Sequence, residues 1–251
     1  MEAYVKSHIE HGINTIEFFH PQSNSLPGKI LEELAKEIHF AGTHNETKII
    51  ILKSEGEKSF CAGASFDELA AIKTGQQGLQ FFSGFANVIN AMRKCPKFII
   101  GRIQGKCVGG GVGLACAVDY AIATIQAEVK LSELAVGIGP FVVGPAVERK
   151  IGTSAFNALA IDATMWRSAD WAKRKGMFAE VHESIENMDE GINRLANTLS
   201  HSSSEAMAEM KKMFWYGTEH WDGLLKERAA ISGKLVLSGF TKNAIAKFKA
   251  K

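Results

Sequence analysis

The sequence has few of the features that mark metal, disulfide or membrane proteins. It contains no C-x-x-C pair and no H-x-x-x-H spacing, so neither a cysteine zinc site, a thioredoxin-type motif nor a metal is expected. No charge-free apolar run is long enough to cross a bilayer, and residues 1–12 lack the apolar stretch of a signal peptide. We therefore expect a cytoplasmic protein without a membrane partner. Its four cysteines are expected to be reduced and mostly buried: Cys61, Cys95, Cys107 and Cys116.

An excess of charge is also absent. The 29 basic and 27 acidic residues leave a formal charge of +2, which gives no field that would attract nucleic acid. The exception is a lysine cluster near the C-terminus, which is typical of a solvated helix end. It comprises Lys242, Lys247, Lys249 and Lys251.

What the sequence does contain is an alternation of short apolar runs with helical periodicity across residues 48–150, which predicts an α/β core. After Pro145 no proline follows, and the remaining pattern predicts helices. The expected elements are a hairpin over 4–19, a helix from Pro27 that stops before Gly42, strands over 48–53 and 97–103, a helix over 78–94, and a short helix between Ser168 and Gly176.

Two turns of small residues each lie between an apolar run and a helical segment. They are residues 62–64, Ala-Gly-Ala, and residues 109–111, three glycines, after which a helix is expected from Gly113. Taken alone, the glycine turn is more often a flexible connection than an anion site. Glycine, however, lets backbone N–H groups face a ligand, and two N–H groups aimed at one oxygen would stabilise developing negative charge.

Five motifs, in order, resemble those of the enoyl-CoA hydratase/isomerase, or crotonase, superfamily. SFCAGASFDEL (59–69) is similar to F-x-A-G-A-D-[LI]-x-E-[ML], and GKCVGGGVGLACAVD (105–119) is similar to G-x-x-x-G-G-G-x-E-L-x-x-x-x-D. NSL (24–26) resembles an N-A-L motif, VKLSELAVGIGPF (129–141) resembles F-x-x-P-E-x-x-x-G-[IL]-x-P, and SADWAKRKGMFAEV (168–181) resembles S-A-x-x-A-x-x-x-G-[LM]-V-x-x-V. Together they span most of the chain.

The resemblance implies an α/β, crotonase-like spiral of ββα units over residues 1–184. It implies a C-terminal helical region over 185–251 that assembles homotrimers, often stacked as hexamers. It also implies an acyl-CoA substrate, which carries the coenzyme A, and no permanently bound cofactor.

Roles for single residues follow from the same resemblance. The N–H groups of Ala64 and Gly110 would form an oxyanion hole for the thioester oxygen, and Glu133 would be the catalytic residue. Residues expected to border the CoA or the acyl chain are Ser25, Ala62, Ser65, Phe66, Gly109 and Phe141.

The chain departs from the family pattern at two positions. Hydratases of this family resemble one another in having two glutamates, but the first position is Gly113 here and only the second, Glu133, is present. In addition, Ser65 replaces the aspartate of the first motif. Hydration usually divides proton transfer between two carboxylates, whereas moving a double bond from C3 to C2 needs only one base. The sequence therefore favours isomerisation.

The apolar neighbours of Glu133 are expected to raise its pKa toward working pH; they are Leu131, Leu134 and Val136. For Asp119 a structural role is expected.

Two alternatives remain open. One is a hydratase or dehydratase for a short or branched enoyl-CoA, methylglutaconyl-type included, with a substitute for the missing glutamate. Asp67, Glu68 and Glu148 are candidates, although each fits a helix-surface charge better. The other is a non-catalytic scaffold that holds acyl-CoA, or RNA through the lysine tail.

Overall fold

The computed structural model describes residues 2–249, with side chains up to Lys247, so Lys251 and the side chain of Lys249 in the lysine cluster lie outside the described part. The strands are β1 (Tyr4–Glu10), β2 (Ile13–Phe19), β3 (Ile49–Ser54), β4 (Ser59–Cys61), β5 (Phe98–Ile103), β6 (Lys106–Val108), β7 (Tyr120–Thr124), β8 (Val129–Lys130) and β9 (Glu180–His182). The helices are α1 (Gly28–Thr43), α2 (Phe66–Ala71), α3 (Gly75–Lys94), α4 (Gly110–Ala117), the 3₁₀ helix η1 (Glu133–Val136), α5 (Gly144–Ile161), α6 (Ala169–Arg174), α7 (Ile185–Ser200), α8 (Ser204–Phe214), α9 (Trp221–Leu235) and α10 (Gly239–Lys249).

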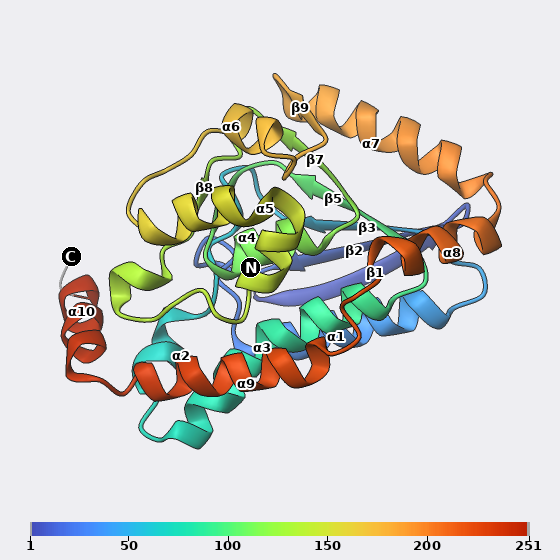
Figure 1. The fold of residues 1–251 in the computed structure, drawn as a ribbon. Coiled ribbons are helices and arrows are strands. Elements are labelled where there is room, and N and C mark those ends of the chain that lie inside the picture. Colours follow the sequence, from blue (N-terminus) through green and yellow to red (C-terminus); the bar gives the residue numbers. More distant parts are fainter. Residues whose placement is uncertain (1, 250–251) are drawn as a thin grey trace.

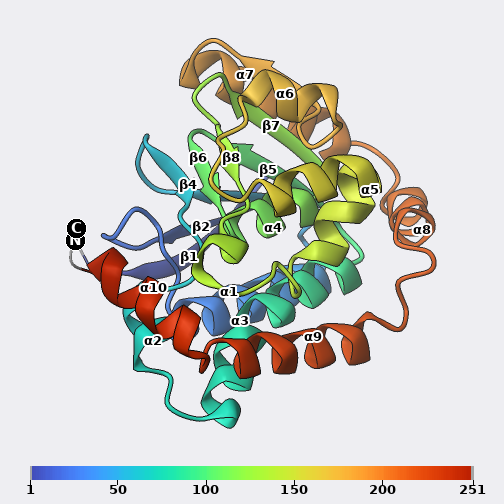
Figure 2. The same ribbon diagram turned by 60° about the vertical axis from the view of Figure 1, so that its left-hand side comes forward.

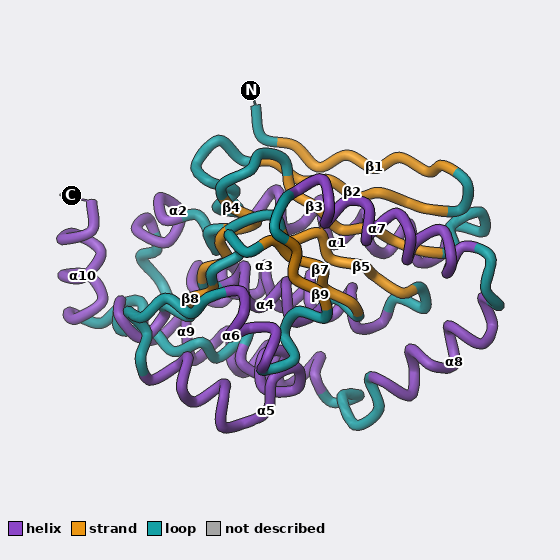
Figure 3. The backbone as a smooth tube through the Cα atoms, turned by 90° about the horizontal axis from the view of Figure 1, so that it is seen from above, coloured by secondary structure: helices purple, strands orange, loops and turns teal. Residues whose placement is uncertain are grey.

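The main sheet has six strands in the order β1-β2-β3-β5-β7-β9, and only β1 and β2 pair antiparallel. Buried residues point to both faces, as strand alternation requires. On β3, Ile50 and Leu52 belong to the large core with α1 and α3, whereas Ile49 and Ile51 pack with α7 and α8. Helices thus cover both faces of the sheet (Figures 1 and 3).

A second, parallel sheet of three short strands, β4-β6-β8, completes a repeated unit. Each of its strands follows directly on a main-sheet strand: β4 on β3, β6 on β5 and β8 on β7. Helices follow each pair, so the core is the expected spiral of strand–strand–helix units. Short strands in one sheet bring the segments that follow them to a common edge.

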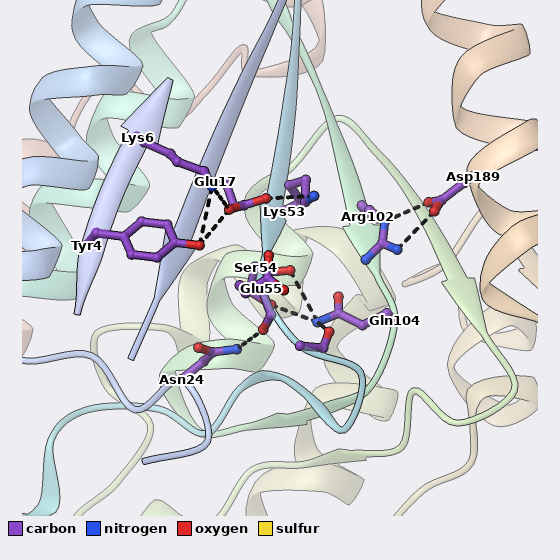
Figure 4. A network of polar contacts seen from close by, with 11 residues as sticks. Tyr4, Lys6, Glu17, Asn24, Lys53, Ser54, Glu55, Arg102, Gln104 and Asp189 are labelled. Carbon is purple, nitrogen blue, oxygen red and sulfur yellow. Dashed lines mark hydrogen bonds and ion pairs between the residues drawn. The ribbon is translucent and has the colours of Figure 1, made fainter. Parts of the chain in front are cut away.

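Buried polar side chains hold the corners between the two sheets. Gln104, between β5 and β6, donates through Nε2 to Ser54 Oγ at 2.8 Å and to the carbonyl of Gly56 at 2.9 Å. Asn24 donates to the carbonyls of Glu55 at 2.9 Å and Ser59 at 3.0 Å (Figure 4). These bonds satisfy backbone carbonyls that leave the strand ladders, and they fix the loop before α1 next to β4.

Several local predictions are confirmed. The β1–β2 hairpin turns at His11 and Gly12, whose φ angles are 50° and 82°. Strands β3 and β5 lie where the apolar runs predict them, and Ser168 Oγ caps α6 by accepting from the backbone N–H of Trp171 at 3.2 Å. All four cysteines are buried free thiols.

Three predictions are wrong in detail. Gly42 does not follow α1 but lies inside it. Its lack of a side chain serves packing rather than helix termination, because an added Cβ would stand 3.1 Å from Cys95 Sγ. The helix after the glycine triplet begins at Gly110 rather than Gly113, since Gly109 makes the turn alone with φ 52°. The three-residue strand β9 was not expected among the C-terminal helices.

Asp119 has the expected structural role. Its carboxylate accepts from the backbone N–H of Ile99 at 2.8 Å and from Trp215 Nε1 at 3.2 Å, and it pairs with Lys211 Nζ at 2.5 Å. This buried ion pair joins α8 to the segment before β7, and removing either partner would leave an uncompensated buried charge.

The C-terminal helices continue from the core without a further strand in the described part of the chain. Helix α9 lies along α3 (Figures 1 and 2), and an added Cβ on Gly78 would come within 2.6 Å of Gly233 Cα. Helix α10 then packs Phe240 and Thr241 against Gly137, just after η1. No helix within residues 2–249 is long and apolar enough to cross a membrane. The domain boundary at residue 184 and the trimer stay predictions.

Candidate active site

A cavity of about 960 Å³ lies where the second sheet meets α2, α3, η1 and α10. Its wall is largely apolar, with Phe66, Leu69, Phe81, Phe82, Phe85, Ile138 and Phe141 among the lining residues. Of the residues predicted from the motifs, those that line it are Ala62, Ala64, Phe66, Gly109, Gly110, Glu133 and Phe141. Apolar walls with a few polar groups are typical of small-molecule sites.

The two small-residue turns lie side by side in this cavity. An added Cβ on Gly63, whose φ is 91°, would stand 3.0 Å from the carbonyl oxygen of Val108 and 3.5 Å from the backbone nitrogen of Gly110. Only glycine allows this approach of two backbones. The two turns are therefore neighbours in space, which periodicity alone could not establish.

Both turns offer N–H groups without an acceptor in residues 2–249: that of Ala64 in the first turn, and those of Gly110 and Gly111 in the second. Leu26 donates to the carbonyl of Gly63 at 2.7 Å and accepts from Ser65 at 3.1 Å, so the N–H of Ala64 between them points away from Leu26. Gly110 is the first residue of α4, where an N–H group has no acceptor within the helix. The site thus brings the free N–H of Ala64 next to a helix N-terminus, whose first N–H group is that of Gly110.

Glu133 lies directly over the second turn. An added Cβ on Gly109 would stand 3.1 Å from Glu133 Oε1, while Oε2 is buried and has no hydrogen-bond partner among the described residues. Burial raises the pKa of this carboxyl from 4.5 to about 7, although a hydrogen bond from its own backbone N–H acts in the opposite direction. The carboxyl can therefore both take and return a proton near neutral pH.

The direction of this shift is as the sequence predicts, but one expected cause is wrong. Leu131 is fully buried beside the site, whereas Leu134 is 50% exposed because the 3₁₀ turn directs it outward. Leu134 therefore does not supply the burial.

The position of a second glutamate is occupied by another side chain. An added Cβ on Gly113 would lie 2.5 Å from Val143 Cγ1 and 2.7 Å from Val143 Cβ. Among the cavity-lining residues that the structure describes, Glu133 is the sole carboxylate.

None of the three candidate substitutes lines the cavity. Glu68 Oε2 accepts from the backbone N–H of Gly28 at 2.8 Å, and Glu148 is exposed on α5. Asp67 lies on α2, where Gln22 Nε2 is 3.4 Å from its Oδ2.

Two predicted contact residues lie outside the lining. Ser65 is the N-cap of α2, where its Oγ accepts from the backbone N–H of Glu68 at 3.4 Å. Serine replaces the motif's aspartate here without loss of a cap. Ser25 is 8% exposed, and its Oγ is 3.5 Å from His20 Nδ1. Their contacts with CoA stay predictions.

Sequence reasoning missed part of the cavity wall. Phe81, Phe82 and Phe85 line it from α3, and their helical spacing was an available signal for an apolar face. Lys130 lines it from β8, next to the motif glutamate. No sequence signal indicated that α10 would contribute Phe240. Within residues 2–249 no three His, Cys, Asp or Glu side chains are grouped to hold a metal ion.

The chain is similar in sequence to proteins of a known family. A family model described as enoyl-CoA hydratase/isomerase matches residues 8–240. A (7aS)-7a-methyl-1,5-dioxo-2,3,5,6,7,7a-hexahydro-1H-indene-carboxyl-CoA hydrolase of Mycobacterium tuberculosis is 25% identical over 208 residues, which cover 81% of this chain and 80% of that protein. Mitochondrial methylglutaconyl-CoA hydratase of Mus musculus is 32% identical over 161 residues, 64% of this chain but only 51% of the relative.

A crystal structure of enoyl-CoA hydratase from Bacillus halodurans superposes with a TM-score of 0.89 at 21% identity, over 97% of this chain and 99% of that one. The fold is therefore crotonase-like.

Proposed function

Since the chain belongs to the enoyl-CoA hydratase/isomerase family, we propose that it transfers a proton at C2 of an enoyl-CoA thioester and moves the double bond. The observation that carries this proposal is one buried carboxyl, Glu133, beside two N–H groups, with Val143 in the place of a second carboxylate. A single base suits isomerisation.

In the proposed reaction the thioester oxygen accepts hydrogen bonds from Ala64 and Gly110. Glu133 takes the proton from C2 of a 3-enoyl-CoA. The electron pair of that C–H bond forms a C1–C2 double bond, and the carbonyl electrons move onto the thioester oxygen, which gives a dienolate. When the carbonyl re-forms, the C1–C2 pair moves to C2–C3, and the electrons of the former C3–C4 double bond take the proton back at C4. The step is balanced, since the proton only changes carbon and Glu133 returns to its ionised form.

The N–H groups matter most at the midpoint of this reaction. Negative charge then resides on the thioester oxygen as a dienolate, and fixed donors in a mostly apolar cavity stabilise it without reorganisation. Removal of one such donor typically slows a reaction by roughly a hundredfold to a thousandfold. The pKa of Glu133, about 7, lets the same group act as base and then as acid.

Hydration of a 2-enoyl-CoA is the second candidate. It is favoured by the likeness to methylglutaconyl-CoA hydratase, a protein named for that type of reaction. In this chain a water molecule would have to be held without a second carboxylate on the cavity wall.

The test is to incubate purified protein in deuterated water with 3-enoyl-CoA and, separately, with 2-enoyl-CoA. We expect deuterium at C2 and a shifted double bond from the first substrate. Glu133→Gln should slow both the deuterium exchange at C2 and the shift of the double bond by roughly 10²–10⁴-fold, while acyl-CoA still binds. Glu148→Gln, at an exposed carboxylate, is the matched control.

Three outcomes would contradict the proposal. Faster hydration than isomerisation by the wild-type protein would favour the second candidate. Measurable acyl-CoA binding without exchange from any thioester would favour a non-catalytic scaffold. If Glu133→Gln kept its turnover, Glu133 would be excluded from the mechanism.

A further inference from the structure

The cavity wall carries two cations, Lys130 on β8 and Lys247 on α10, and Lys130 is the one close to the glycine turn. Lys130 is the last residue of β8, and its neighbours Val129 and Leu131 are fully buried on the core side. Strand alternation therefore turns Lys130 toward the cavity, which it lines. Its ammonium group forms no ion pair with any residue between 2 and 249. A cation without a partner at the wall of an apolar cavity is suited to an anionic ligand.

The lysine head is nevertheless held in place. Lys130 Nζ stands 4.3 Å from the ring centroid of Trp166, and Lys106 Nζ stands 4.7 Å from the same centroid. Lys106 is already paired, with Glu128 Oε2 at 3.2 Å. Burial, and then the charge of Lys106, lower the pKa of Lys130. The charged form is thus less stable here than in water, and an anion bound beside it would offset this.

Lys130 also stands close to the proposed reacting centre. Its carbonyl oxygen accepts from the backbone N–H of Gly109 at 2.9 Å, and Lys130 pairs with Val108 across the β6–β8 ladder. Paired strands are about 4.8 Å apart, so the lysine backbone is one strand away from the turn that ends in Gly110. In an acyl-CoA the phosphates are separated from the thioester by the whole pantetheine arm. An anion on the acyl group is nearer.

We propose that Lys130, supported on the ring of Trp166, is a subsite for a carboxylate at the far end of the acyl group, so that the substrates are CoA thioesters of dicarboxylic acids. This rests on the proposed function, because it takes the thioester to lie at Ala64 and Gly110. The phosphates of CoA share the same chemistry, and the test separates the two sources.

The test compares the binding of two saturated thioesters of equal chain length by calorimetry: glutaryl-CoA, which ends in a carboxylate, and pentanoyl-CoA, which ends in a methyl group. The same two acyl groups on pantetheine lack the nucleotide and its phosphates. We expect wild-type protein to prefer the glutaryl group in both series. Lys130→Met should weaken glutaryl binding roughly tenfold in both and abolish the preference.

Matched variants sharpen this result. Lys106→Met removes the other cation on the same ring, which already has its own partner, and should keep the glutaryl preference. Lys130→Arg retains the charge and should keep most of the preference. If Lys130→Met fails to fold, the wild-type preference and its decrease with salt still decide the matter.

Each other result overturns the proposal. Equal weakening of both CoA esters by Lys130→Met, with pantetheine esters unaffected, would assign Lys130 to the phosphates of CoA. Absence of a glutaryl preference in wild-type protein would exclude the subsite. Because these thioesters are saturated, failure of the exchange experiment would refute proton transfer and leave this binding result intact.

Discussion

Replacement of Glu133 by glutamine should change how stability depends on pH. The folded protein holds this carboxyl at a pKa of about 7, against an ordinary value of 4.5. The folded pKa is the higher one, so the buried carboxyl is destabilising only when it ionises. The resulting loss of folding free energy is absent well below pH 4.5. It grows as pH rises between the ordinary pKa of 4.5 and the folded pKa of about 7, and it is complete above about pH 7.

The magnitude follows from the same two values. One pKa unit corresponds to about 1.4 kcal/mol, so a rise from 4.5 to about 7 corresponds to about 3 kcal/mol at high pH. Between about pH 5 and about pH 8, roughly 2–3 kcal/mol of this should develop. Glutamine fills the same volume but does not ionise. The free energy of unfolding of Glu133→Gln should therefore rise by this amount relative to that of wild type between about pH 5 and about pH 8.

Urea unfolding at both pH values, followed by tryptophan fluorescence at one protein concentration, measures the effect. Glu148→Gln, at an exposed position, should show no comparable gain. A difference between wild type and Glu133→Gln that does not vary with pH would refute the reasoning, because the carboxyl would then titrate alike in the folded and unfolded states. The same ionisation predicts that kcat/KM rises with pH through about 7.

Two further predictions concern packing. Lys211→Met should lower the free energy of unfolding by about 3–5 kcal/mol, because Asp119 is left buried without its counter-charge; equal thermal midpoints for this variant and for the exposed Lys212→Met would contradict it. Gly113→Glu should lower the free energy of unfolding by about 1–3 kcal/mol, because Val143 fills the space, and Val143→Ala should recover part of it. A double-mutant cycle measures this coupling, and strictly additive effects would speak against it.

Features that depend on neighbouring residues could be predicted from the sequence. The turn at Gly12, the cap at Ser168 and the buried strand β3 each follow from short patterns. The motifs also indicated which two turns would meet, since their order along the chain resembles a known family.

Features that depend on contacts between distant residues could not be predicted. In the sequence Gly42 resembles a helix stop, but in the structure it packs against Cys95. Gly113 resembles a position that has only lost a glutamate, but in the structure Val143 fills the space of its side chain. Lys130 was one more charged residue until Trp166 was found beside it. In each case the deciding atom belongs to another element, and periodicity carries no information about it.

The contact between Gly78 and Gly233 has a consequence for the cavity some distance away. Helices α3 and α9 approach there with no side chain between them, so main-chain sterics alone set their separation. Helix α10 continues a few residues after α9 and brings Phe240 to the cavity wall. A methyl group added at Gly78 or Gly233 would therefore push α9 away from α3 and shift α10, which carries Phe240. The shape of the cavity thus depends on two residues that do not line it.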